Sequence, residues 1–135
     1  MSGKVFLDSN VLLYAYSVTE PDKKRVAVGV MREPETCIST QVLTEFANIC
    51  RRKYGYDWPA IDNLLTEVMV NFSVHINTPQ TILRATQVAQ RYGFSWFDSL
   101  IVAAALESGC QTLYTEDLQH GQLLDGSLQV LNPFQ

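Results

Sequence analysis

The sequence predicts an α/β fold in which helices cover both faces of a central parallel sheet of four to five strands. Short apolar runs of β type alternate along the chain with longer segments of helical periodicity. Strands that are separated by helices pair in parallel through right-handed crossovers. The 135 residues contain no repeat and no Pro/Gly-rich linker, so we expect a single domain over residues 1–135.

The first strand and two helical segments are predicted within residues 4–31. Residues 4–7 (KVFL) form a short apolar run that is typical of a buried strand, and a short helical turn is expected over residues 10–16. A helix is then expected over residues 21–31. Thr19 is its predicted N-cap, and Pro21 stands in its first turn, where the missing N–H of proline is tolerated.

The second strand is predicted at residues 36–39 (TCIS). Either Ser39 or Thr40 can cap the helix that follows, since both hydroxyls suit an N-cap. This helix is expected to run to about residue 54. Gly55 is then placed to adopt the left-handed conformation that closes many helices.

Two further helices flank the third predicted strand. Asp57 begins a helix that reaches about residue 70, and the strand spans roughly residues 72–76. Thr78 followed by Pro79 then opens a helix that ends at Gly93.

The last part of the chain contains the most apolar helix. Ser95 caps this helix over residues 96–108, and Gly109 closes it. Because it carries no charge between its first turn and residue 106, we expect it to be buried on most sides. Residues 112–114 (TLY) are the fourth predicted strand, and residues 128–131 (LQVL) are a possible fifth.

The composition predicts an ordinary globular protein of the cytoplasm with no membrane association. Hydrophobic residues make up 47% of the chain and charged residues 18%. The longest apolar run, residues 100–106, is far short of the roughly 20 residues that span a bilayer. Asp8 and Asn10 interrupt the N-terminus before a signal-peptide core can form. Three cysteines without CxxC spacing favour buried thiols over disulfides or a zinc site.

The net charge is −4, from ten basic and fourteen acidic residues. This balance alone counts against a nucleic-acid partner, which normally binds a basic surface. However, six of the ten bases fall in two triplets, residues 23–25 and 51–53. If divalent cations neutralised four carboxylates, the remaining acidic and basic charges would balance. The net charge therefore does not exclude a nucleic-acid partner.

Four acidic residues are candidates for one site. Asp8 directly follows the first strand and Asp117 follows the fourth, so both are expected at the ligand-binding edge of the sheet. Asp98 lies in the first turn of the apolar helix, and a charge there needs a partner. Glu45 lies on the flank of the helix after the second strand and can lean into the same cleft.

Each of these acids also has an ordinary structural interpretation. Asp8 suits a turn or cap, and Asp117 suits a solvated loop in which Glu116 competes for its role. Asp98 stands three residues after Ser95, as in a capping box, and Glu45 can be a surface residue of its helix. Together, however, four converging carboxylates would repel one another unless a cation neutralised them. Oxygen-only ligands favour Mg²⁺ or Mn²⁺, which suit phosphoryl chemistry.

Four short motifs resemble those of the PIN-domain nucleases. They are DSNVL after the first strand, LTEF around Glu45, WFDSL at the start of the apolar helix, and YTED after the fourth strand. Their order and spacing cover residues 5 to about 117, and the small VapC-type toxins of type II toxin–antitoxin systems are similar in length. The resemblance implies a PIN-like three-layer fold.

The resemblance also implies a function and a set of site residues. It implies a Mg²⁺- or Mn²⁺-dependent endoribonuclease whose catalytic and metal-binding residues are Asp8, Glu45, Asp98 and Asp117. Asn10 and Thr115 match polar positions that support this site. Relatives of this type act on structured RNA such as tRNA or rRNA, form homodimers, and are inhibited by a cognate antitoxin protein.

Other residues are weaker candidates for RNA contacts. Arg51, Arg52 and Lys53 can bind phosphates, but they can equally complement the dipole at the C-terminus of their helix. Trp96 and Phe97 could stack on a base, although beside an apolar helix we expect them in the core.

Three other functions are compatible with this fold class and are distinguished by single residues or by the four acids. A receiver domain needs an aspartate at the end of the third strand, where this chain has His75-Ile76-Asn77. A haloacid-type phosphatase needs a second aspartate at Asn10. The remaining alternative is a catalytically degenerate PIN-fold module that binds RNA or protein. The presence of all four acids favours the nuclease over that alternative.

Overall fold

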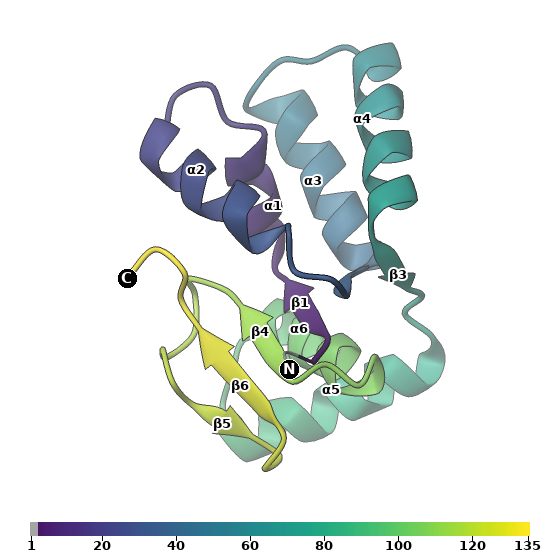
Figure 1. Cartoon of the computed structure of the whole chain (residues 1–135). Coiled ribbons are helices and arrows are strands. Elements are labelled where there is room, and N and C mark those ends of the chain that lie inside the picture. Colours follow the sequence, from purple (N-terminus) through teal and green to yellow (C-terminus); the bar gives the residue numbers. More distant parts are fainter. Residues whose placement is uncertain (1–2) are drawn as a thin grey trace.

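A computed structural model describes residues 3–135 and contains a mixed α/β arrangement (Figure 1). The strands form a six-stranded sheet in the order β3-β2-β1-β4-β6-β5. Their bounds are β1 (Val5–Leu7), β2 (Thr36–Ser39), β3 (Ser73–His75), β4 (Thr112–Tyr114), β5 (Leu123–Leu124) and β6 (Leu128–Leu131). The helices are α1 (Ser9–Ala15), α2 (Pro21–Val30), α3 (Thr40–Arg52), α4 (Trp58–Asn71), α5 (Pro79–Tyr92) and α6 (Trp96–Glu107).

The direction of the crossovers explains the three layers. From β1 to β3 the chain moves along the sheet in one direction, and from β3 it returns to β4 on the other side of β1. With right-handed crossovers, this reversal puts the intervening helices on opposite faces. Figure 1 shows α1–α4 gathered on one side of the sheet and α5 and α6 on the other. The predicted three-layer fold is therefore confirmed.

The sheet has one more strand than the largest number expected from the sequence. Five strands are parallel, whereas β5 pairs with β6 in the antiparallel direction. A strand of two residues is too short to produce a periodic pattern. Asp125-Gly126 nevertheless marks the hairpin, since both residues have positive φ (50° and 68°), as tight hairpin turns require.

The core surrounds β1 and α6. The side chains of Phe6 and Leu7 are fully buried, and so is most of α6 from Ser99 to Ala105. The three cysteines are also buried and unpaired, as the sequence predicts. No helix within residues 3–135 is both long and apolar enough to cross a membrane.

Most of the predicted caps are confirmed. Ser39, Asp57, Thr78 and Ser95 each accept a hydrogen bond from a backbone N–H in the first turn of α3, α4, α5 and α6, respectively. The prediction that Thr19 caps α2 is wrong, because Glu20 occupies the N-cap position. The hydroxyl of Ser17 accepts the N–H groups of Thr19 and Glu20 instead, so a local turn replaces the cap.

Candidate metal centre

Asp8 is fixed at the end of β1 and at the start of α1. Its backbone N–H donates to the carbonyl of Tyr114 (3.0 Å), which ties it to the end of β4. One carboxylate oxygen accepts the N–H of Ser9 (2.7 Å), and the other accepts the hydroxyl of Thr115 (2.8 Å). Burial raises the pKa of Asp8 to about 6 even though these hydrogen bonds favour the charged form. The Asp8 side chain is thus held rigidly in a position where its charge is costly.

Asp117 lies just beyond β4, at the same edge of the sheet. Its N–H donates to the Thr115 hydroxyl (3.1 Å), and its carboxylate accepts the side-chain amide of Asn10 (3.2 Å). Thr115 therefore links Asp8 and Asp117 directly. Burial, followed by the charges of Asp98 and Glu116, raises the pKa of Asp117.

Glu116, the competitor of Asp117 in the sequence, points elsewhere. Its carboxylate accepts the hydroxyl of Tyr14 (2.6 Å) and lies 3.5 Å from the ammonium group of Lys23. These two partners come from α1 and α2, and Lys23 also lies over the ring of Tyr14. Because Glu116 is paired in this way, Asp117 is the acid of this loop that is available to the site.

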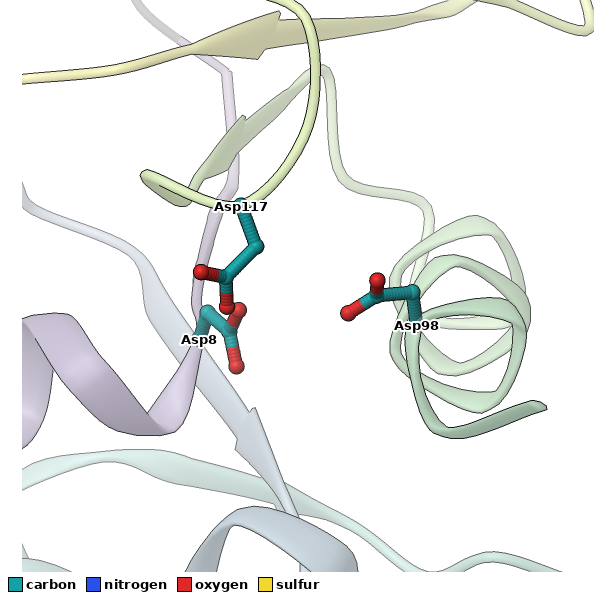
Figure 2. A group of neighbouring side chains, drawn as sticks. All are labelled: Asp8, Asp98 and Asp117. Carbon is teal, nitrogen blue, oxygen red and sulfur yellow. The ribbon is translucent and has the colours of Figure 1, made fainter. Parts of the chain in front are cut away.

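Asp98 approaches the other two aspartates from the N-terminus of α6. Its N–H donates to the Ser95 hydroxyl (3.2 Å), which fixes the first helical turn. Figure 2 shows its carboxylate pointing toward Asp8 and Asp117. One oxygen from each of these three side chains lies within 4.8 Å of the others. Residues that are up to 109 positions apart in the sequence therefore converge at one point.

Glu45 joins the site from α3 through a serine. The Ser9 hydroxyl lies 3.3 Å from an oxygen of Asp8 and 3.3 Å from an oxygen of Glu45, so it can donate to either. The Gln41 amide lies 3.5 Å from the same oxygen of Glu45. Burial, followed by the charges of Asp98 and Asp117, raises the pKa of Glu45 against these hydrogen bonds. Glu45 is not part of the group of three, but it faces the same space.

These residues enclose a cavity of about 210 Å³. It is lined by Asp8, Ser9, Asn10, Leu13, Gln41, Glu45, Asn48, Ile49, Phe97, Asp98, Ile101 and Asp117. This lining contains four carboxylates and no lysine or arginine. The cavity is therefore strongly negative at neutral pH, and nothing in its lining neutralises that charge.

The donor set fits a hard divalent cation. Every polar side chain in the lining offers oxygen or an amide, and none offers sulfur or imidazole. Carboxylate oxygens are the ligands that Mg²⁺ and Mn²⁺ prefer. Burial, with a further contribution from neighbouring charges, raises the pKa values of Asp8, Glu45 and Asp117, and a bound cation would favour their ionised forms.

The other predicted residues lie outside the cavity or differ from expectation. Arg51, Arg52 and Lys53 stand at the C-terminal end of α3 and do not line the cavity. Arg51 donates to the carbonyl of Tyr56 (3.1 Å). The expectation that Trp96 and Phe97 lie in the core is wrong, because they are 41% and 63% exposed. The buried part of α6 begins after its first turn, at Ser99.

Three polar residues that line the cavity, Ser9, Gln41 and Asn48, were not among the site residues predicted from the sequence. Ser9 links Asp8 to Glu45, and Gln41 contacts Glu45 and the carbonyl of Phe97 (3.2 Å). Gln41 precedes Glu45 by one helical turn, so its place on the same flank of α3 was visible in the sequence. The role of Ser9 depends on the packing of α1 against α3, which no local signal indicates.

The chain was compared with known families, sequences and structures. A family model described as PIN domain matches residues 5–123. A search of curated protein sequences finds no match.

Several solved structures are similar in fold. A toxin–antitoxin complex from Klebsiella pneumoniae has a TM-score of 0.72 at 19% identity, covering 96% of this chain and 97% of that one. VapC20 of Mycobacterium tuberculosis, described as a toxin that cleaves the sarcin-ricin loop, has a TM-score of 0.66 at 18% identity and covers 84% and 89%. VapBC2 of Rickettsia felis, solved with a promoter DNA fragment, has a TM-score of 0.67 at 14% identity and covers 96% and 100%.

Proposed function

Because the chain belongs to the PIN domain family, we propose that it is a Mg²⁺- or Mn²⁺-dependent endoribonuclease that hydrolyses phosphodiester bonds of RNA. The observation that carries this proposal is the convergence of Asp8, Asp98 and Asp117 to within 4.8 Å in a cavity that has no neutralising base. A catalytically degenerate module would have no need to keep these three carboxylates together, with Asp8 buried beside them. We further propose that residues 1–135 form one nuclease domain.

The proposed roles follow from the contacts. Asp8, Asp98 and Asp117 would hold the cation, and Glu45 would complete the site from the side of α3. Thr115 and Asn10 orient Asp8 and Asp117, and Ser9 couples Asp8 to Glu45. A divalent cation in this site would polarise a phosphate oxygen and lower the pKa of a water molecule.

We also propose that this nuclease is the toxin of a toxin–antitoxin pair that acts in the cytoplasm. The support is that the three similar structures reported above are a toxin or toxin–antitoxin complexes. The proposed partners are a structured RNA of the tRNA or rRNA class, a cognate antitoxin protein, and a second copy of the chain in a homodimer. One of these relatives is described as cleaving the sarcin-ricin loop, which supports the choice of structured RNA.

Arg51, Arg52 and Lys53 are proposed to contact RNA away from the cleaved bond. They lie about two turns beyond Glu45 on α3, which corresponds to roughly 10 Å along the helix. Phosphates that flank the cavity at that distance would be within reach of these long side chains.

The experiment that tests the function is incubation of the purified protein with total RNA. We expect new, discrete 5′ ends in the presence of Mn²⁺ or Mg²⁺ and none in EDTA. Asp98→Asn should abolish cleavage, because it removes one charge from the group of three. Its fold should stay intact, since the backbone N–H that Ser95 caps remains in place.

Two outcomes would contradict the proposal. Cleavage that is undiminished in Asp98→Asn would show that the activity does not come from this site. Failure of the wild-type protein to cleave total RNA, tRNA or rRNA with saturating Mn²⁺ would favour the degenerate binding module.

A further inference from the structure

An aromatic ring stands exposed at the edge of the acidic cavity. Phe97 lines the cavity together with Asp8, Asp98 and Asp117, yet 63% of the residue is exposed. Within residues 3–135, none of the aromatic pairs or cation–π contacts involves this ring. A ring that is mostly exposed and has no aromatic or cationic partner contributes little to the core.

The backbone of Phe97 is anchored to the carboxylate site. Its carbonyl accepts the Gln41 amide (3.2 Å), and the same amide group lies 3.5 Å from the Glu45 carboxylate. The hydroxyl of Ser95 caps the turn that carries Phe97 and Asp98. These hydrogen bonds hold the backbone of Phe97 in place relative to the carboxylates, while its side chain remains accessible to solvent.

The cavity has no basic side chain that could hold a nucleotide by its phosphate. No lysine or arginine lines it, so side-chain charge does not attract a phosphate there. Apart from contacts with a bound cation, a nucleotide in the cavity would therefore be held by uncharged groups. The Gln41 side chain also keeps a buried oxygen without a hydrogen-bond partner, which a donor from a ligand would satisfy.

The spacing of Phe97 and Asp98 suits one nucleotide. Phe97 and Asp98 line the same cavity, so the ring lies near a carboxylate of the proposed metal site. A phosphate held at the carboxylates carries a sugar and base that can reach the ring. Bases stack on aromatic side chains without regard to sequence, because every base has a π-face.

We propose that Phe97 is a stacking platform for an unpaired nucleobase next to the cleaved phosphodiester. This inference rests on the proposed nuclease function. It makes Phe97 a residue that selects substrate by conformation, since a base that is paired in a duplex cannot lie on the ring. The preferred RNA is thus single-stranded, or bulged, at the point of cleavage.

The test compares Phe97→Leu with the wild-type protein on short single-stranded oligoribonucleotides. Leucine keeps an apolar side chain in the first turn of α6 but removes the π-face. We expect KM to rise about tenfold on a normal substrate, with kcat changed less, because the substitution removes the stacking of one base. On a substrate that is abasic beside the cleaved bond, both proteins should have the same KM. Phe97→Tyr should restore the wild-type value.

Trp96→Leu is the matched control. It removes an exposed ring one residue away that does not line the cavity, so KM should stay within about twofold of the wild-type value. Equal KM values for Phe97→Leu and wild type on the normal substrate would overturn the proposal. So would a loss that is the same on the normal and abasic substrates.

A binding measurement separates this proposal from the proposed function. Fluorescence anisotropy of labelled oligoribonucleotides in EDTA reports stacking without cleavage. One possible result is that no RNA is cleaved but Phe97→Leu weakens binding only of the base-containing oligonucleotide. That result would support the stacking platform and contradict the nuclease function. If Phe97→Leu instead converts a dimer into monomers in sedimentation and leaves RNA binding unchanged, the ring belongs to an interface between two copies, and the platform is refuted.

Discussion

At the scale of the residue, the site is defined by carboxylates placed where their charge is disfavoured. Asp8 is 5% exposed, and its two oxygens accept hydrogen bonds from Ser9 and Thr115. Those bonds fix its orientation but do not offset burial, so its pKa rises to about 6. Strain of this kind at a buried acid is typical of functional sites.

The first prediction concerns the pH dependence of the metal-free protein. The folded pKa of Asp8 lies above its unfolded value of 3.8, so its contribution to stability is fully present below about pH 4 and is lost as the pH rises to about 6. The loss amounts to at most about 3 kcal/mol in the free energy of unfolding. Urea denaturation in EDTA should therefore show Asp8→Asn gaining stability relative to wild type between pH 4 and 6. A constant difference over that range would contradict the buried, strained state of Asp8.

The second prediction distinguishes two neighbouring acids. Glu116→Gln should retain cleavage within a few-fold, because Glu116 contacts Tyr14 and Lys23 and does not line the cavity. Asp117→Asn should lose at least about a hundredfold in kcat, since it removes a proposed cation ligand. The measurement is single-turnover cleavage of one RNA by both variants. Equal losses in the two variants would contradict the assignment of Asp117.

At the scale of the element, α6 combines two functions in one helix. Its apolar body from Ser99 to Ala105 is buried, while its first turn extends to the sheet edge with Asp98 and Phe97. The cap at Ser95 stabilises that turn, which has little packing of its own. A short-range hydrogen bond therefore controls the position of a proposed cation ligand.

The third prediction tests this cap. Ser95→Ala should lower the free energy of unfolding by about 1 kcal/mol and weaken Mn²⁺ binding several-fold, because the turn that carries Asp98 frays. Thr78→Ala removes the equivalent cap of α5, away from the cavity, and serves as the control. It should cause a similar loss of stability with unchanged Mn²⁺ affinity, measured by calorimetric titration. Equal Mn²⁺ affinities in the two variants would show that the cap has no role in the site.

At the scale of the whole molecule, the site lies where the topology reverses. The chain leaves β1 in one direction along the sheet and reaches β4 on its other side, so their carboxyl ends open a crevice between the helical layers. Asp8 and Asp117 stand at this crevice, and α3 and α6 bring Glu45 and Asp98 to it from opposite faces. Metal binding and global folding should therefore be coupled.

The fourth prediction measures this coupling. At a Mn²⁺ concentration 100 times its dissociation constant, a cation that binds only the folded state stabilises it by about 2.7 kcal/mol. For a chain of 135 residues this should raise Tm by roughly 10 °C. Asp98→Asn should lose most of that shift, as seen by thermal denaturation with and without Mn²⁺. An unchanged Tm of the wild-type protein at saturating Mn²⁺ would contradict a preformed site.

Local signals in the sequence predicted the helices, five of the six strands and the order of the acids along the chain. Hydrophobic periodicity, caps and helix-closing glycines depend on residues that are close together in the chain. The helices after Ser39, Asp57, Thr78 and Ser95 could therefore be predicted from the local sequence. The alternation of strands and helices fixed the parallel sheet, and this placed Asp8 and Asp117 at one edge. The two-residue strand β5 was not predicted, because two residues are too few to show an alternating pattern. The Asp-Gly pair of its turn is nevertheless present in the sequence.

The direction in which the side chains point depends on how distant segments pack in the folded chain. Glu116 turns away from the cavity because Tyr14 and Lys23, about a hundred positions earlier, supply its partners. Phe97 is exposed at the cavity although the residues that follow it in α6 are apolar and buried, so the local sequence predicted its position wrongly. The orientations of these side chains depend on the energies of contacts between segments that are distant in the chain. No local sequence pattern reveals those energies.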